Sequence, residues 1–98
     1  MITTKQRAYL RGQANSMDTI LQIGKGGIAE QLIKQVDDAL SAREMIKLKV
    51  LENSFLSARE AATQLAEATG CDIVQVIGSR FVLFRQNKDK DKRIYKLD

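Results

Sequence analysis

Residues 19–42 read TILQIGKGGIAEQLIKQVDDALSA, and this stretch decides the fold. Its first five residues are β-rich and mostly apolar, which predicts a short strand over Thr19–Ile23. From Ile28 to Leu40 an apolar residue recurs at every fourth position, which predicts a helix over 28–42 with one apolar stripe. A Gly-Lys-Gly-Gly loop, residues 24–27, therefore connects a strand to a helix.

The glycine-rich loop has the chemistry of an anion site. Glycine lacks a Cβ and accepts φ > 0, so Gly24 and Gly27 let a sugar-phosphate backbone approach the main chain closely. The start of the following helix adds N–H groups and a partial positive charge, and Lys25 adds a full charge. Gly-x-x-Gly spacing is common in proteins, so the placement between strand and helix is what supports this interpretation.

Three families of glycine loop can be compared with this one. A nucleotide-hydrolysing P-loop needs Lys-Ser or Lys-Thr after a glycine, and the chain has neither. A dinucleotide-binding fold matches Gly24, Gly26 and Ala29, but it needs two βαβ halves where this chain has one such unit. The KH-like clamp fits best, because it holds about four backbone nucleotides with a Gly-x-x-Gly loop that contains basic residues.

The rest of the chain predicts two more helices and three more strands. Capping-box pairs, Thr3 with Gln6 and Ser57 with Glu60, indicate where the two helices begin, and Gly70 is placed to end the second. The remaining predicted elements are helices over 4–14 and 57–69 and strands over 45–51, 72–77 and 80–85.

The element order is αβαβαββ. A strand, a crossover helix and a strand in succession imply parallel pairing with a right-handed crossover, and the last two strands are close enough to form a hairpin at an antiparallel edge. We therefore expect an α/β chain of the two-layer α+β kind, with helices packed against a four-stranded mixed sheet.

Length and composition indicate one small domain. The chain has 98 residues, of which 44% are hydrophobic and 29% charged. We expect the folded domain to occupy residues 1–86 and residues 87–98 to form a flexible charged tail, with a short ordered stop around Ile94 and Tyr95 as the alternative. No apolar stretch approaches the ~20 residues of a membrane span, and the first residues lack the apolar segment of a signal peptide, so we expect a cytoplasmic protein without a membrane partner.

The net charge of +4 is unevenly distributed. Residues 1–29 carry +3, residues 30–72 carry −3 and residues 73–98 carry +4. If the two basic ends lie together, they form one electropositive face that includes the glycine loop, as in nucleic-acid-binding proteins. The alternative is a solvated surface with a charged tail.

Catalytic and cofactor chemistry has little support in the sequence. The chain has no histidine and one cysteine, so we expect no metal site, no cofactor and no small-molecule substrate. Asp37 and Asp38 are adjacent on a helix and point in different directions, which suggests a solvated face rather than a catalytic pair. Cys71 is interpreted as a small buried hydrophobic residue, and the protein as a non-enzyme.

The type of nucleic acid follows from the few aromatic residues. The chain has three phenylalanines and two tyrosines, and we assign Phe55, Phe81 and Phe84 to the core. Without a stacking platform for single strands, recognition of phosphates and of the shape of a folded RNA fits better than base-by-base readout. Lys47 and Lys49 share one face of their strand, and they are equally well explained as nucleic-acid contacts or as its solvated side.

Four ordered motifs within about residues 3–86 resemble the CRM domain (chloroplast RNA splicing and ribosome maturation), in its free-standing bacterial form. They are Thr-Lys-Gln-Arg-Ala-Tyr-Leu-Arg at 4–11, Leu-Gln-Ile-Gly-Lys-Gly-Gly at 21–27, Ala-Arg-Glu-Met-Ile-Lys-Leu-Lys-Val at 42–50 and Ile-Gly-Ser-Arg-Phe-Val-Leu-Phe-Arg at 77–85. The resemblance implies a fold similar to the C-terminal domain of translation initiation factor 3. It also implies RNA binding and association with precursors of the large (50S) ribosomal subunit.

The same resemblance implies which residues meet the RNA. Gly24, Lys25, Gly26 and Gly27 would form the contacting loop, and Lys5, Arg7 and Arg11 would extend the basic surface. Family members usually carry proline after the first helix, and this chain has none.

Three functions are therefore compared. The leading hypothesis is an RNA-binding protein that binds rRNA in ribosome assembly. The second is a general nucleic-acid-compacting protein without a ribosomal role. The third, of a different class, is a protein-interaction module that uses the faces of its second and third helices.

Overall fold

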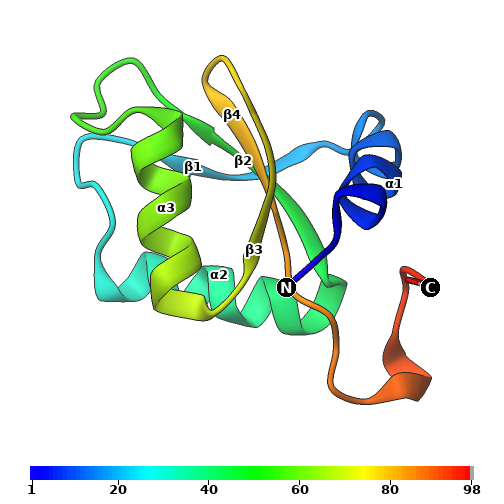
Figure 1. Cartoon of the computed structure of the whole chain (residues 1–98). Helices are drawn as coiled ribbons and strands as arrows, with labels where there is room; N and C mark the ends of the chain where they lie inside the picture. Colours follow the sequence, from blue (N-terminus) through cyan, green and yellow to red (C-terminus); the bar gives the residue numbers. More distant parts are fainter. Residues whose placement is uncertain (98) are drawn as a thin grey trace.

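The stretch 19–42 folds as a strand, a turn and a helix, and it organises the sheet. In the computed structural model, which describes residues 1–97, strands β1 (Thr19–Ile23) and β2 (Met45–Val50) are parallel neighbours joined through helix α2 (Glu30–Arg43). Strands β3 (Asp72–Ile77) and β4 (Arg80–Phe84) form the predicted hairpin. The mixed sheet has the order β1-β2-β4-β3, so the α+β class and the four-stranded mixed sheet are confirmed (Figure 1).

This topology brings three strand ends together. Because β4 is antiparallel to both β2 and β3, the carboxyl ends of β1, β2 and β3 lie at the same end of the sheet, where β4 begins. The glycine loop after β1, the loop after β2 and the β3–β4 turn all leave from this end, and the Val50 N–H donates to the Ser79 carbonyl there at 2.7 Å. We call it the loop end of the sheet.

Both predicted capping boxes are present. Thr3 and Gln6 cap helix α1 (Thr4–Ala14), Ser57 and Glu60 cap helix α3 (Ala58–Thr69), and Gly70 ends α3 in the left-handed region at φ +68°. In the second box the Ser57 N–H donates to Glu60 Oε1 at 3.0 Å, and this backbone hydrogen bond is the largest cause that lowers the pKa of the Glu60 carboxyl.

The predicted start of α2 at Ile28 is wrong. Gly27 has φ +67° and Ala29 has an extended backbone, so the helix begins at Glu30.

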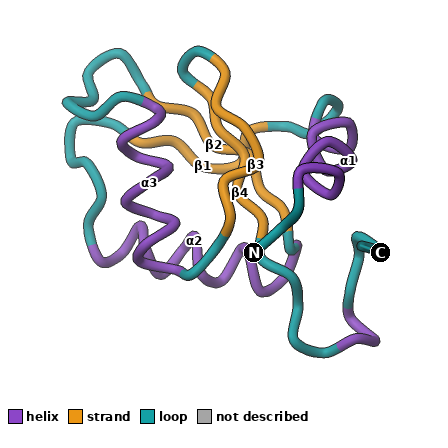
Figure 2. The backbone as a smooth tube through the Cα atoms, in the orientation of Figure 1, coloured by secondary structure: helices purple, strands orange, loops and turns teal. Residues whose placement is uncertain are grey.

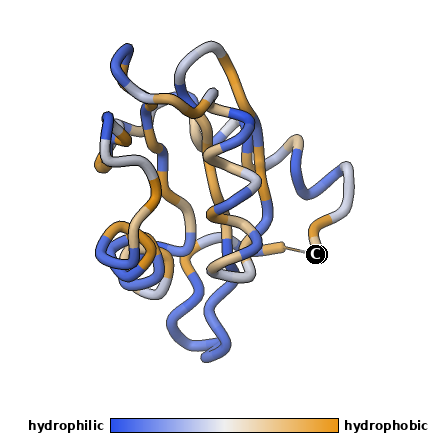
Figure 3. Tube along the Cα trace, turned by 90° about the vertical axis from the view of Figure 1, so that its left-hand side faces the viewer, coloured by the Kyte–Doolittle hydropathy of each residue, from blue (hydrophilic) through white to orange (hydrophobic). Residues whose placement is uncertain are grey.

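Helices α2 and α3 cover one face of the sheet (Figures 1 and 2). Their small and branched side chains pack on alternate residues of the strands, and hydrophobic positions gather in the centre of the chain trace (Figure 3). The buried residues of this first core are Ile23, Val36, Leu40, Ile46, Leu48, Val50, Ala58, Ala61, Ala62, Leu65, Phe81 and Leu83.

A second core lies on the opposite face, under α1 and the C-terminal segment. Its buried residues are Ile2, Leu10, Ala14, Met45, Val74, Val82 and Phe84. Strand β4 therefore contributes to both cores, with Phe81 and Leu83 on one face and Val82 and Phe84 on the other.

For residues 87–97 the expectation of a flexible tail is wrong and the ordered alternative holds, while Asp98 lies outside the described residues. Lys90–Lys92 form a short 3₁₀ helix, and Tyr95 and Leu97 pack against the second core. The Tyr95 ring meets Phe84 edge-on, with ring centroids 6.1 Å apart. Burial, together with the nearby Glu44 carboxylate, raises the pKa of the Tyr95 hydroxyl. The final segment is part of the folded unit.

Arg85 connects three elements beneath the first core. Its guanidinium forms an ion pair with Asp37 at 2.6 Å and donates to the Thr69 carbonyl and the Ser41 hydroxyl. Asp37 is exposed, as expected for a solvated face, and it also takes part in this ion pair. Arg85 contributes to the net charge, but its hydrogen bonds are used within the fold.

Glu44 holds the C-terminal segment in place. It is 1% exposed and, at φ 63°, it is the one non-glycine residue with positive φ among residues 1–97. Its carboxylate accepts hydrogen bonds from the backbone N–H groups of Asn87 (2.6 Å), Ile94 (2.6 Å) and Tyr95 (3.0 Å). Three donors on one buried carboxylate satisfy both the acid and the peptide groups around it.

We predict that Glu44→Ala lowers the free energy of unfolding by about 2–3 kcal/mol, because buried N–H groups lose a charged acceptor. The melting temperature should fall by roughly 10–20 °C for a domain of this size. Thermal and urea denaturation measure both quantities. Glu44→Gln keeps one acceptor oxygen and should lose less stability. Glu67→Ala, at an exposed position of α3, is the matched control. Equal stability of Glu44→Ala and Glu67→Ala would contradict this role.

Candidate nucleic-acid interface

The glycine loop is a tight turn at the loop end of the sheet. The Gly27 N–H donates to the Gly24 carbonyl at 3.1 Å, which closes the turn and leaves Lys25 and Gly26 exposed at its tip. Of the three glycines, Gly27 alone requires glycine for its backbone angle, at φ +67°. A Cβ on Gly26 would meet nothing within 4 Å, so a ligand can approach the main chain there.

Gly24 has a different environment from the other two. A Cβ at this position would lie 3.5 Å from Asn53 Oδ1 and 3.6 Å from Leu51 Cδ1, which are ordinary contact distances. Gly24 is thus at the base of the turn, against the loop that follows β2, rather than at its accessible tip.

The start of α2 lies two residues beyond the turn. Ala29 occupies the N-cap position, and no side chain caps the helix there. The first-turn N–H groups and the helix dipole favour an anion beside the turn, although Glu30 in the first turn offsets part of that field.

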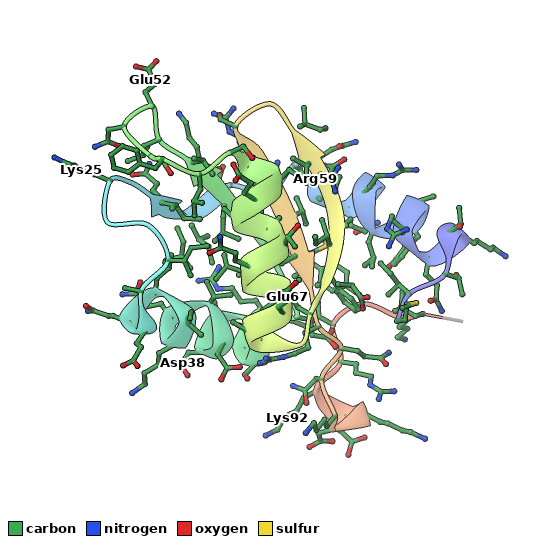
Figure 4. All side chains as sticks on the ribbon, turned by 60° about the vertical axis from the view of Figure 1, so that its left-hand side comes forward. Lys25, Asp38, Glu52, Arg59, Glu67 and Lys92 are labelled. Atoms are coloured by element: carbon green, nitrogen blue, oxygen red, sulfur yellow. The ribbon has the colours of Figure 1, made fainter. Side chains whose placement is uncertain are left out.

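The loop after β2 runs beside the glycine turn. The Leu51 N–H donates to the Ile23 carbonyl at 2.8 Å, so the two loops leave the sheet together. Figure 4 shows Lys25 and Glu52 pointing outward from this same end of the molecule. The site is therefore formed by two loops and not by the glycine turn alone.

The sheet contributes a row of exposed side chains, with the half-buried Lys49 among them, next to these loops. Gln22, Lys49, Arg80 and Ile77 stand opposite one another in register across all four strands. Since Leu48 and Val50 face the first core, this row lies on the other face, beyond the part covered by α1. Lys47 shares that face, where it lines a hollow with Asn15 and Arg80.

We call Gln22, Lys49, Arg80 and Ile77 the cross-strand row. Sequence alternation placed Lys47 and Lys49 on one face, but it could not select Arg80. Its position beside Lys49 comes from the antiparallel pairing of β2 with β4.

The basic residues of α1 lie at the other edge of the sheet. Arg7 and Arg11 line an open groove along edge strand β3, together with Arg59 from α3. Arg7 Nε donates to the Ile73 carbonyl at 3.2 Å, so part of its hydrogen-bonding capacity is used in the fold. Lys5 is exposed and, two residues before Arg7, projects from another side of the helix.

The expected residues therefore form two groups. Gly24, Lys25, Gly26 and Gly27 lie beyond edge strand β1, and Arg7 and Arg11 lie beside edge strand β3. Figure 4 shows Lys25 and α1 at opposite sides of the molecule. The single basic face is expected only if the two basic ends lie together, and the glycine turn and the arginines of α1 are separated by the two central strands β2 and β4.

Comparison with known proteins settles the family. The model of the CRS1/YhbY (CRM) domain matches residues 2–85. The chain belongs to the CRM domain family. The resemblance seen in the four sequence motifs is thus confirmed.

Relatives of this CRM domain occur in bacteria and archaea. It is 39% identical to the "Probable RNA-binding protein YqeI" of Bacillus subtilis, over 91% of this chain and 93% of that protein. It is 34% identical to the "Probable RNA-binding protein MJ0652" of Methanocaldococcus jannaschii, over 97% of this chain and 72% of that protein. The solution structure of the hypothetical protein SAV1595 from Staphylococcus aureus matches with a TM-score of 0.78 and 50% identity, over 95% of this chain and 97% of that one.

Cys71 of the CRM domain is half-buried and lines the β3 groove. It packs against the first core, and burial is the largest cause that raises the pKa of its thiol. A raised pKa leaves little thiolate at neutral pH, which agrees with a packing role.

Two further observations concern residues 1–97 of the CRM domain. They contain no group of three or more histidine, cysteine, aspartate or glutamate side chains arranged to hold a metal ion. No helix in this range is both long enough and apolar enough to cross a membrane.

We predict that Gly27→Ala lowers the free energy of unfolding by about 1–2 kcal/mol, because a Cβ disfavours the left-handed backbone at φ +67°. Gly26→Ala is the matched control, since its Cβ would enter open space without that backbone angle. Urea denaturation of the two variants measures the difference. Equal stability would show that the turn relaxes to another conformation.

Proposed function

We propose that this CRM domain is a non-catalytic, cytoplasmic RNA-binding protein that binds rRNA in precursors of the large ribosomal subunit during assembly. The observation that carries the proposal is the glycine turn, where Lys25 and an open Gly26 backbone stand just before an uncapped helix start. The names of the Bacillus and Methanocaldococcus relatives, which describe RNA-binding proteins, support it.

The turn supplies the chemistry for a phosphate. Lys25 brings a full positive charge on an exposed side chain, and the backbone at Gly26 admits a phosphate without a steric barrier. The cross-strand row extends this surface with Lys49 and Arg80 on the adjoining face of the sheet. Backbone contacts of this kind give affinity and position without reading base sequence.

The groove at the β3 edge adds a second basic surface. Arg11 and Arg59 line it at the far side of a molecule whose principal extents are 39 × 24 × 21 Å. An RNA that contacts both surfaces has to curve around the domain or present two segments, as a folded RNA does. Large ribosomal RNA offers many such shapes, which supports the assembly role.

General compaction of nucleic acid is the second candidate. Basic surfaces at both sheet edges could bridge two strands of any nucleic acid through phosphate contacts alone. The two functions differ in the particles with which the protein associates in the cell.

Sedimentation of a lysate separates these candidates. If the proposal holds, the tagged full-length chain co-migrates with large-subunit precursor particles, and nuclease releases it. Spread over all RNA or with the nucleoid favours compaction instead. Association that survives nuclease would contradict both and favour a protein-interaction module.

We predict that Lys25→Ala weakens RNA binding while the melting temperature stays nearly unchanged, because the side chain is exposed. Loss of one phosphate contact should reduce the slope of log K against log salt concentration by about 0.7–0.9. Titration at several salt concentrations measures both effects. Lys92→Ala, at the opposite end of the molecule from Lys25 in Figure 4, is the control for loss of one charge. Equal effects of the two substitutions would sink the assignment to the glycine turn.

We predict that Arg11→Ala also lowers the salt slope by about 0.7–0.9, if the groove at β3 holds RNA backbone. Arg11 is the better probe of this groove, because Arg7 also donates to the Ile73 carbonyl. The Lys25→Ala and Arg11→Ala effects should add on a folded rRNA fragment, since the two sites lie far apart. An unchanged slope for Arg11→Ala would restrict the interface to the loop end.

A further inference from the structure

Phe55 is not a core residue, in contrast to the expectation from sequence. Its side chain is 84% exposed, whereas Phe81 and Phe84 are at most 1% exposed. Among residues 1–97 only Met1 is a more exposed large hydrophobic residue. A phenylalanine side chain left in solvent contributes none of the folding free energy that its burial in either core would give.

The backbone around Phe55 fixes this outward position. The Ser54 N–H donates to the Leu51 carbonyl at 3.0 Å, and the Ser54 hydroxyl bonds both the N–H and the carbonyl of Leu56. The next side chain, Leu56, packs against the first core. With Ser54 and Leu56 held, the ring between them is displayed on a braced turn rather than on a loose loop.

This turn belongs to the same loop pair as the glycine turn. The loop that carries Phe55 starts at Leu51, which hydrogen-bonds Ile23 immediately before Gly24. Asn53, two residues before Phe55, lies against Gly24. Figures 1 and 2 show the loops after β1 and β2 side by side at one end of the sheet.

We propose that Phe55 stacks on an unpaired nucleobase of an RNA whose backbone is held at the glycine turn. The inference rests on the proposed function and deepens it, because it adds a base contact to a site otherwise built for phosphates. A nucleotide carries an anion and a flat aromatic face joined by a sugar, and this loop pair offers a cation and a flat aromatic ring. Neither Lys25 alone nor Phe55 alone specifies that combination.

The charged setting favours a nucleobase over an apolar protein partner. Lys25, Glu52 and Asn53 of these two loops are exposed polar or charged side chains, whereas the half-buried Leu56 next to the ring packs against the first core. A lone ring beside a phosphate site suits stacking, which tolerates any base because every base has a π-face. The preferred RNA therefore has a bulged or single-stranded nucleotide next to a structured backbone.

The test compares two RNA hairpins that differ by one bulged uridine. Phe55→Ala should weaken binding to the bulged hairpin by about 5- to 150-fold and leave binding to the fully paired hairpin nearly unchanged. The salt slope should stay the same, because stacking releases no counterions, whereas Lys25→Ala lowers the slope on both hairpins. Phe55→Tyr should bind the bulged hairpin as the wild-type chain does, and Phe55→Leu should bind it as weakly as Phe55→Ala.

Two controls keep the outcome specific. The exposed ring makes Phe55→Ala harmless to folding, which an unchanged urea denaturation curve verifies. Tyr9→Ala removes another exposed aromatic residue, on α1, and should not affect the bulge preference.

Phe55→Trp adds the only tryptophan of the chain, and its fluorescence should be quenched by the bulged hairpin and not by the paired one.

The failure of this inference can be told from failure of the proposed function. If Lys25→Ala weakens binding but Phe55→Ala has no effect on either hairpin, the stacking role is overturned and RNA binding at the glycine turn stands. If Phe55→Ala weakens both hairpins equally, the ring does not read an unpaired base. If the wild-type chain binds neither hairpin nor an rRNA fragment, the proposed function itself fails. Loss of self-association in Phe55→Ala, with RNA binding intact, would assign the ring to a protein contact.

Discussion

The burial of strand β4 on both faces is the constraint on which the remaining structure depends. Alternate side chains of one short strand, Phe81 to Phe84, complete two cores, so the sheet must have helices on one side and α1 with the C-terminal segment on the other. Because β4 enters between β2 and β3, three strands finish at one end of the sheet. That end is left to loops, and loops on a rigid sheet can carry a binding site without disturbing either core.

Glu44 links this arrangement to the end of the chain. It stops α2, turns the backbone at positive φ into β2, and places a carboxylate where three N–H groups of the last segment converge. The strain of that backbone angle is offset by hydrogen bonds that a residue on the helix surface could not make. The C-terminal segment thereby becomes a cover for the second core, and Lys92 lies at the opposite end of the molecule from Lys25 (Figure 4).

The basic residues divide between two edges because the sheet separates them. One group serves the loop end, where Lys25 is joined by Lys49 and Arg80 of the cross-strand row. The other lines the groove beside β3, where arginines of α1 and α3 converge. Arg85 belongs to neither group, since its guanidinium is occupied by Asp37, Thr69 and Ser41. Net charge alone therefore overestimates the number of basic side chains that are available to a nucleic acid.

The sequence by itself determined the features that depend on near neighbours. Capping boxes, the alternation in β2, the glycine turn and the β3–β4 hairpin all follow from residues a few positions apart, and each was predicted. The order β1-β2-β4-β3, the exposure of Phe55, the place of Arg80 beside Lys49 and the capture of the last segment by Glu44 were decided only by tertiary structure. The physical reason is that burial and hydrogen bonding depend on partners distant in sequence: Lys49 pairs with Arg80 across two strands, and Glu44 and Tyr95 are 51 residues apart. Local patterns carry no information about which distant group will arrive, so a phenylalanine that composition assigns to the core can instead stand in solvent beside the glycine turn.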